Sequence, residues 1–221
     1  ARRLAAVWRS GRVSKYNQLR EYGGALPGRY ALVVDQTFGD ASIQHGLAGP
    51  QSFQRMLEAA LSENPDSTVL VKIHPDVVAG RKKGYFDMAK LLRMPRVQVI
   101  GADVHPVNLI EHADAVYVVT SQLGFEGLLW GKPVRTFGMP FYAGWGLTQD
   151  ELPAPARRRP LSLDNLVHGA LVEYPRYLDP ETDQRCEPER LIEWMALQRQ
   201  MHTRFPDTVY AVGFSYFKKP V

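Results

Sequence analysis

The chain alternates between short, nearly continuous apolar runs and segments whose apolar residues recur at helical spacing. The apolar runs lie at residues 30–35, 68–73, 97–100, 115–119 and 133–137. Helical spacing is found between them, at residues 51–62, 85–93, 106–112 and 122–130. Strands that are apolar along their whole length are typical of a sheet buried on both faces, and intervening helices are typical of βαβ units. We therefore predict an α/β fold with a Rossmann-like parallel sheet and helices on both faces.

The alternation stops after Thr148. Residues 150–160 are rich in proline and arginine and are predicted to cross the surface. The remaining predicted elements are two helices and a strand, at residues 162–172, 187–204 and 208–212. We expect residues 1–205 to form one domain with C-terminal helices, and residues 206–221 to be a linker or the start of a following module.

Composition limits the class of protein. The 221 residues carry a net charge of +4, with 27 Lys and Arg against 23 Asp and Glu. No run of about 18 apolar residues is present, which excludes a membrane-spanning helix. The single cysteine, Cys186, cannot form an internal disulfide and fits a reducing compartment. The chain begins with neither methionine nor the apolar core of a signal peptide, and we interpret this as an internal start.

The densest basic run, residues 157–159, lies between two prolines. It is interpreted as a solvated loop, with contact to an anionic lipid headgroup or a phosphate as the alternative. Basic stripes interleaved with aromatic residues, which are typical of proteins that stack on bases, are not visible. No nucleic-acid partner is expected.

Ligands of parallel α/β sheets bind beyond the carboxyl ends of the strands, so the loops at that edge carry the candidate chemistry. The first of these loops contains Asp35, Gln36 and Asp40. A carboxylate there could serve as a base or a nucleophile, and ordinary turn formation is the alternative for each residue. The spacing does not choose between Asp35 and Asp40.

The second loop places Lys72 and His74 on the same face of a strand near its end, and Pro75 follows directly. A lysine and a histidine at a strand end are suited to binding a phosphate. A capped loop histidine is the alternative for His74. His105, which also precedes a proline, is interpreted as structural because that proline fits the first position of a helix.

The fourth loop has a hydroxyl pair, Thr120 and Ser121, at a junction between a strand and a helix, which predicts an anion site at the helix N-terminus. Glu126 lies about one helical turn further and could reach the ribose of a nucleotide bound there. The alternative is a plain helix cap with Glu126 in solvent. This loop and that of His74 are expected on adjacent strand ends, which together favour a nucleotide.

The fifth loop, residues 138–148, combines three glycines with three aromatic residues. We favour a wall that faces a sugar or an acceptor, with a hydrophobic plug as the alternative. Common catalytic signatures are absent from the sequence: no GxGxxG follows the first strand, and there is no Walker A, HExxH or GxSxG motif.

Several of these segments resemble one family. They read SKYN at residues 14–17, QTFGD at 36–40, HP at 74–75, TS at 120–121, FE at 125–126 and PFYAGWGLT at 140–148. They resemble the capsular polysaccharide biosynthesis β-Kdo transferases of the KpsC/LipB type. The resemblance implies two GT-B-like modules in tandem that use CMP-Kdo. It implies a short poly-Kdo linker built on a phosphatidylglycerol-type lipid at the cytoplasmic face of the inner membrane. The chain resembles the donor-binding half of the first module.

The resemblance also assigns roles to residues. It places the family's QxxxD pattern on Gln36 and Asp40, and it implies that Asp40 is the nucleophile of a retaining reaction. The HP motif falls on His74 and Pro75, where the histidine contacts the donor phosphate. Ser121 and Glu126 match the phosphate and ribose positions of the donor site.

The expected function is that of a retaining β-Kdo glycosyltransferase, present as a fragment that requires neither a cofactor nor a metal ion. Its expected partners are CMP-Kdo, a phosphatidylglycerol-type lipid carrying Kdo, the membrane surface and other capsule assembly proteins. The expected location is cytoplasmic and peripheral to the inner membrane. The first alternative is a non-catalytic module that binds a sugar nucleotide or a lipid headgroup in capsule export. The second alternative is a GT-B epimerase acting on a UDP-sugar.

Overall fold

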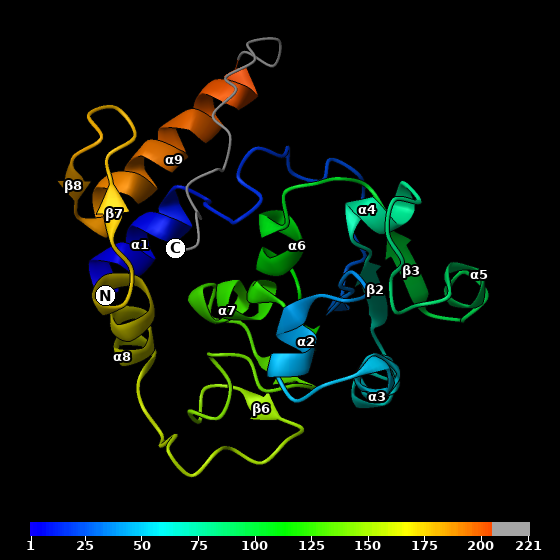
Figure 1. Cartoon of the computed structure of the whole chain (residues 1–221). Helices are drawn as coiled ribbons and strands as arrows, with labels where there is room; N and C mark the ends of the chain where they lie inside the picture. Colours follow the sequence, from blue (N-terminus) through cyan, green and yellow to red (C-terminus); the bar gives the residue numbers. More distant parts are fainter. Residues whose placement is uncertain (205–221) are drawn as a thin grey trace.

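The computed structural model describes residues 1–204 and contains a six-stranded parallel sheet. The strands are β1 (Tyr30–Val34), β2 (Thr68–Lys72), β3 (Val97–Ile100), β4 (Ala115–Val118), β5 (Val134–Thr136) and β6 (Gln149–Asp150). Their order in the sheet is β3-β2-β1-β4-β5-β6. Figure 1 labels β2 and β3 next to each other and β6 apart from them. The five predicted strands and their parallel arrangement are confirmed. The added strand, β6, has only two residues and extends the edge beside β5.

Helices connect the strands and cover the sheet. They are α1 (Arg2–Ser10), α2 (Ala41–His45), α3 (Pro50–Glu63), α4 (Pro75–Val78), α5 (Met88–Leu91), α6 (Val107–Glu111), α7 (Gln122–Leu129), α8 (Leu163–His168) and α9 (Pro188–Arg204). A π-helical turn, η1 (Gly169–Glu173), continues α8, and a hairpin of β7 (Tyr177–Leu178) and β8 (Arg185–Cys186) precedes α9.

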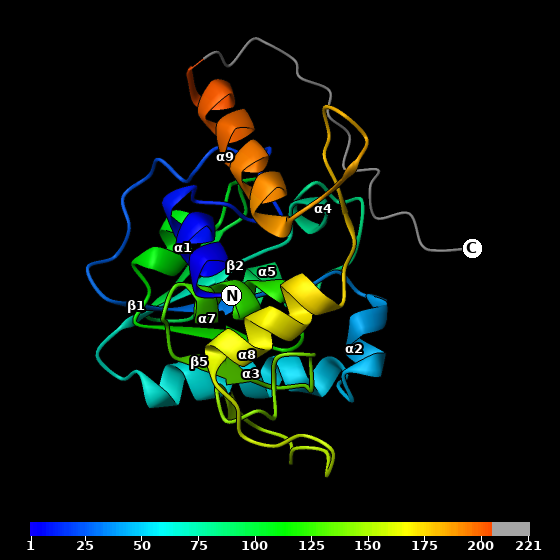
Figure 2. The same ribbon diagram turned by 90° about the vertical axis from the view of Figure 1, so that its left-hand side faces the viewer.

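Both faces of the sheet are buried, as the continuous apolar strands predict. Along β1, Tyr30, Leu32 and Val34 belong to a core that includes residues of α1, α6, α7 and α9. The alternate residues, Ala31 and Val33, belong to a second core with α3 and α5. Figure 2 shows α1 and α9 on one side of the sheet and α3 on the other.

Some elements differ from the prediction. The expected helix at residues 162–172 is α8 followed by the π-turn, which begins at Gly169. The helix α1 was not predicted, and it packs against α9 from the far end of the chain. The predicted strand at residues 208–212 and the proposed module boundary at residues 206–221 lie outside the described residues.

The strand order places a topological switch point at the carboxyl edge of the sheet, between β1 and β4, and we call this place the crevice. From β1 the chain proceeds outward to β2 and β3, and it then returns to β4 beside β1 and proceeds outward on the other side. The connections that follow β1 and β4 lead to helices on opposite faces of the sheet, α3 and α7, and sheets of this kind bind ligands at such a switch point. One expectation is corrected: the loops of His74 and Ser121 follow β2 and β4, and β1 lies between those strands.

Candidate functional site

Gln36 spans the crevice. Its side chain is buried, its Nε2 lies 3.1 Å from Thr120 Oγ1, and its Oε1 accepts a 3.0 Å hydrogen bond from the backbone N–H of Thr120. Ser42 Oγ lies 2.9 Å from the same hydroxyl. These contacts fasten the loop after β1 to the loop after β4, so the geometry of the two loops is fixed together.

Asp40 is the N-cap of α2, where its Oδ1 accepts a 2.9 Å hydrogen bond from Ser42 N. Its Oδ2 lies 3.4 Å from Gln36 Nε2. Partial burial alone would raise the pKa of Asp40, but the hydrogen bonds from Ser42 and Gln36 and the charge of Lys15 outweigh it and lower that pKa. Asp40 is thus an oriented, ionised carboxylate that is only partly buried.

Asp35 has a different environment. It is 3% exposed, its Oδ1 accepts a 3.2 Å hydrogen bond from Tyr85 N, and within residues 1–204 its Oδ2 has no hydrogen-bond partner. Burial raises the pKa of Asp35 to about 6. A Cβ on Gly84 would collide with this Oδ2, so the loop at residue 84 lies directly over Asp35. The buried Asp35 supports a loop, and the ionised Asp40 remains available to a ligand.

The raised pKa of Asp35 predicts a pH dependence of stability. The folded state binds the proton of the Asp35 carboxyl more tightly than the unfolded state does. The stabilisation of the folded state by this proton is therefore complete below about pH 4 and is lost as the pH rises through about 6. The free energy of unfolding of the wild type relative to Asp35→Asn should fall by up to about 3 kcal/mol across this interval. Urea unfolding at pH 4.0, 5.0, 6.0 and 7.0 measures it. A difference that stays constant with pH would contradict the assignment.

Lys72 and His74 end β2 beside the crevice. Lys72 is 4% exposed, and within residues 1–204 its ammonium has no hydrogen bond or ion pair. Burial lowers the pKa of Lys72 to about 8. Its Nζ lies 5.9 Å from the centroid of the Tyr16 ring. The charge of Asp103 acts on Lys72 without forming an ion pair, so an anion bound beside the ammonium would reduce the cost of burying this cation.

His74 Nδ1 accepts a 3.2 Å hydrogen bond from Asp76 N, which places the ring proton on Nε2 as a donor. Burial lowers the pKa of His74, and the charge of Lys72 contributes in the same direction. The ring is therefore neutral at neutral pH. Pro75 is the first residue of α4, so β2 ends before the proline as expected.

Ser121 is the N-cap of α7, and its Oγ accepts a 3.3 Å hydrogen bond from Leu123 N. Glu126 has no exposed surface, and its Oε1 accepts a 3.2 Å hydrogen bond from Lys15 N. Burial raises the pKa of Glu126 to about 7. The alternative with Glu126 in solvent is wrong. In this structure the side chain holds the segment at Lys15, and a contact of Glu126 with a ribose stays a prediction.

The aromatic loop at residues 138–148 is mainly a plug. Tyr142 is fully buried and donates a hydrogen bond to the backbone carbonyl of Ser121. Phe141 is 47% exposed and packs against Phe125 with ring centroids 5.1 Å apart. The favoured interpretation, a wall facing a sugar, is therefore wrong for most of the loop, whose role is to hold the start of α7.

Part of the basic run at residues 157–159 also belongs to this plug. Arg158 Nη1 donates to the carbonyl oxygens of Pro140 at 2.8 Å and Ala143 at 2.6 Å. Its guanidinium lies 5.4 Å from the centroid of the Trp145 ring. The middle arginine is thus an internal clamp, and only its two neighbours are exposed.

Sequence reasoning assigned no role to Lys15 or Tyr16. Both lie near the crevice, where the charge of Lys15 acts on Asp40 and His74. They follow a helix that was not predicted, so no strand end marked their position. The SKYN resemblance was the one signal for them.

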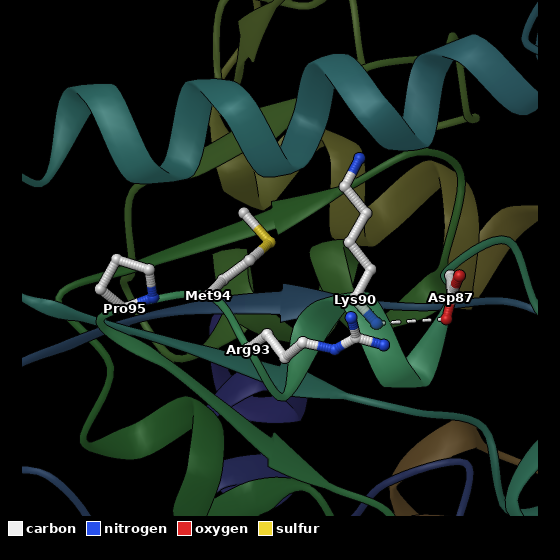
Figure 3. A pocket seen from close by; sticks show the side chains of 5 residues that line it. All are labelled: Asp87, Lys90, Arg93, Met94 and Pro95. Carbon is white, nitrogen blue, oxygen red and sulfur yellow. Dashed lines mark hydrogen bonds between the residues drawn. The ribbon is translucent and has the colours of Figure 1, made fainter.

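A hollow of about 430 Å³ beside α5 lies outside the candidate site. Figure 3 shows its lining side chains, which include Asp87, Lys90 and Arg93. The segment that carries them leads into the start of β3, at the amino end of the strands. Ligand chemistry in this fold is expected at the opposite edge.

Comparisons with known proteins point to one family. Residues 1–177 match the family model described as capsule polysaccharide biosynthesis protein. The capsule polysaccharide modification protein LipA of Neisseria meningitidis serogroup A is 39% identical over 95% of this chain and 31% of its own length. The lipopolysaccharide-processing protein LpsZ of Rhizobium meliloti is 37% identical over 77% of this chain and 38% of its own. The chain spans about a third of the length of these relatives.

Two solved structures from Thermosulfurimonas dismutans are also similar. KpsC described as a beta Kdo 2,4 transferase has 42% identity and a TM-score of 0.80, with 88% of this chain and 61% of that chain covered. KpsC described as a beta Kdo 2,7 transferase has 30% identity and a TM-score of 0.69, and the similarity covers 90% of this chain and 61% of that chain.

Proposed function

This chain belongs to the capsule polysaccharide biosynthesis protein family, and from that premise we propose that it is the donor-binding lobe of a GT-B-like Kdo transferase. The two similar structures carry Kdo transferase titles. The crevice at the switch point of the sheet supports the same assignment, because nucleotide donors bind at this edge. Since the chain covers only part of these relatives, the activity proposed is that of the complete polypeptide.

The proposed donor is CMP-Kdo, and the largely buried side chain of Lys72, whose ammonium has no ion pair within residues 1–204, is the observation that carries this step. An anionic phosphate would supply the missing counter-ion, and His74 Nε2–H would add a second donor. Ser121, at the start of α7, is the proposed third contact with the phosphate. Pro75 fixes the chain direction immediately after His74.

Asp40 is proposed as the nucleophile. Its carboxylate oxygen attacks the anomeric carbon of Kdo, the bond from that carbon to the phosphate oxygen breaks, and the electron pair leaves with CMP. The acceptor hydroxyl oxygen then attacks the same carbon, the ester bond to Asp40 breaks, and the hydroxyl proton is lost to water. Two inversions give net retention. Gln36 is a positioning residue because it holds Asp40 and crosses the crevice to Thr120.

The proposed acceptor is a phosphatidylglycerol-type lipid that carries Kdo, bound with the help of a second lobe. The proposed setting is the cytoplasmic face of the inner membrane, in contact with other capsule assembly proteins. Within residues 1–204 no helix is long and apolar enough to cross a membrane. The proposed attachment is through the lipid acceptor and the membrane surface.

Isothermal titration of the chain with CMP and with UDP tests the donor class. We expect CMP to bind and UDP to bind more weakly, and we expect Lys72→Met to weaken CMP binding by on the order of tenfold or more. Lys90→Met on α5 is the matched control and should leave binding unchanged. Preferential binding of UDP would favour an epimerase. CMP binding without any transfer by the complete polypeptide would favour a non-catalytic module.

The pKa of Lys72 predicts how CMP binding depends on pH. The free protein carries the ammonium charge below about pH 8 and loses it above that value, so the affinity for CMP should fall as the pH rises through about 8. In Lys72→Arg the charge persists and this decrease should be absent. Titrations from pH 6.5 to 9.5 measure it. An affinity of the wild type that stays constant to pH 9.5 would contradict the phosphate contact.

A further inference from the structure

The segment at residues 14–17, which follows α1, is held rigidly beside the crevice. Ser14 and Asn17 are buried, and Asn17 Nδ2 donates a 2.8 Å hydrogen bond to the carbonyl oxygen of Met195 on α9. Lys15 N donates to the buried Glu126 on α7. Two helices, α7 and α9, thus hold this short loop, and its backbone position determines where its exposed side chains lie.

The side chain of Lys15 is exposed at this edge. Its Nζ lies 5.1 Å from the centroid of the Tyr16 ring, and Lys72 Nζ lies 5.9 Å from the same centroid. Within residues 1–204 the Lys15 ammonium has no hydrogen bond or ion pair. The shared ring places Lys15 on the same side of the site as Lys72, which ends β2 two residues before His74, and the charge of Lys15 lowers the pKa of both Asp40 and His74. Two ammonium groups therefore share one aromatic ring at the site.

The proposed donor carries two negative charges at its reacting end. One is on the phosphate, which Lys72 and His74 account for. The other is the sugar carboxylate, which in a 2-keto sugar acid is attached directly to the anomeric carbon. An Asp40 carboxylate that attacks this carbon must approach the sugar carboxylate, and two like charges at that separation repel unless a cation lies beside them.

We infer that Lys15 binds the carboxylate of the transferred sugar and thereby selects a sugar acid over a neutral sugar. The inference rests on the proposed function, because it places this carboxylate beside Asp40. Lys15 is the exposed ammonium whose charge acts on Asp40. Glu126 is a positioning residue, because its carboxylate fixes the backbone at Lys15.

The test compares the affinity of the chain for CMP with its affinity for freshly prepared CMP-Kdo, by isothermal titration. The variants are Lys15→Met, Lys15→Arg and the control Lys90→Met. We expect Lys15→Met to weaken CMP-Kdo binding by on the order of tenfold or more and to leave CMP binding within about twofold of the wild type. Lys15→Arg should retain most of the preference for CMP-Kdo because the charge is kept.

The other outcomes show whether Lys15 binds the phosphate or the sugar carboxylate of the donor. An equal loss for CMP and CMP-Kdo in Lys15→Met would overturn the inference, because Lys15 would then bind the phosphate. No loss for either ligand would also overturn it. A wild type that binds CMP but shows no preference for CMP-Kdo would refute the carboxylate contact and leave the donor class intact. A wild type that binds neither ligand would refute the proposed function itself.

Discussion

Replacement of Asp40 by asparagine is expected to reduce Kdo transfer by on the order of 10³-fold or more, while the affinity for CMP stays within about twofold of the wild type. Asparagine keeps an oxygen that can accept the hydrogen bond from Ser42 N, so the cap of α2 is preserved. What is lost is the anionic oxygen that would form the bond to the anomeric carbon. The substitution therefore separates chemistry from folding.

The matched control for this prediction is Asp87→Asn. Asp87 is likewise an N-cap aspartate, accepting from Ala89 N at 2.9 Å on α5, and it lies outside the crevice. Transfer assays on the complete polypeptide should give the wild-type rate for Asp87→Asn and almost none for Asp40→Asn. Near wild-type transfer by Asp40→Asn would exclude Asp40 as the nucleophile.

Replacement of Gly124 by alanine is expected to destabilise the protein by about 2–3 kcal/mol and to weaken CMP binding. A Cβ at Gly124 would collide with Tyr142 Oη and would lie 2.8 Å from Val118 Cγ2, both in the closed interior beneath α7. Tyr142 cannot retreat without losing its hydrogen bond to the Ser121 carbonyl. The start of α7, where Ser121 is a proposed phosphate ligand, would therefore shift.

Gly127 on the same helix provides the control. A Cβ there would lie 3.1 Å from Val134 Cγ2, a contact that a small side-chain adjustment relieves. Alanine also gains about 1 kcal/mol of helix propensity over glycine, so Gly127→Ala should be close to neutral. Urea unfolding and CMP titration of both variants measure the difference. Equal stability of the two variants would contradict the close packing of Tyr142 on α7.

The sheet could be predicted from the sequence because β1, β2 and β4 are apolar on both faces, a pattern that few other structures produce. The position of the side chains at the strand ends could be predicted because it depends on the strands alone. Lys72 is the last residue of the buried parallel strand β2 and His74 follows it, so both lie at the edge of the sheet where ligands bind. The predictable part of the site is thus the part that the strands position directly.

The remaining features depend on contacts between distant segments. Lys15 reaches the crevice only because Glu126 and α9 hold its loop, and neither contact leaves a local pattern in the sequence. The aromatic residues at 138–148 fit a wall and a plug equally well by composition. The structure shows a plug, because Arg158 donates hydrogen bonds to two carbonyl groups of that loop and holds it closed. Contacts between residues so far apart in the sequence can be identified only in the folded structure.

Intact mass spectrometry of the complete polypeptide during exposure to CMP-Kdo, followed by peptide mapping, detects the covalent bond that Asp40 would form with Kdo. We expect a mass increase of one Kdo residue on the peptide that carries Asp40, absent in Asp40→Asn. Release of CMP and transfer to an acceptor by a protein that remains unmodified at Asp40 throughout turnover would contradict this expectation.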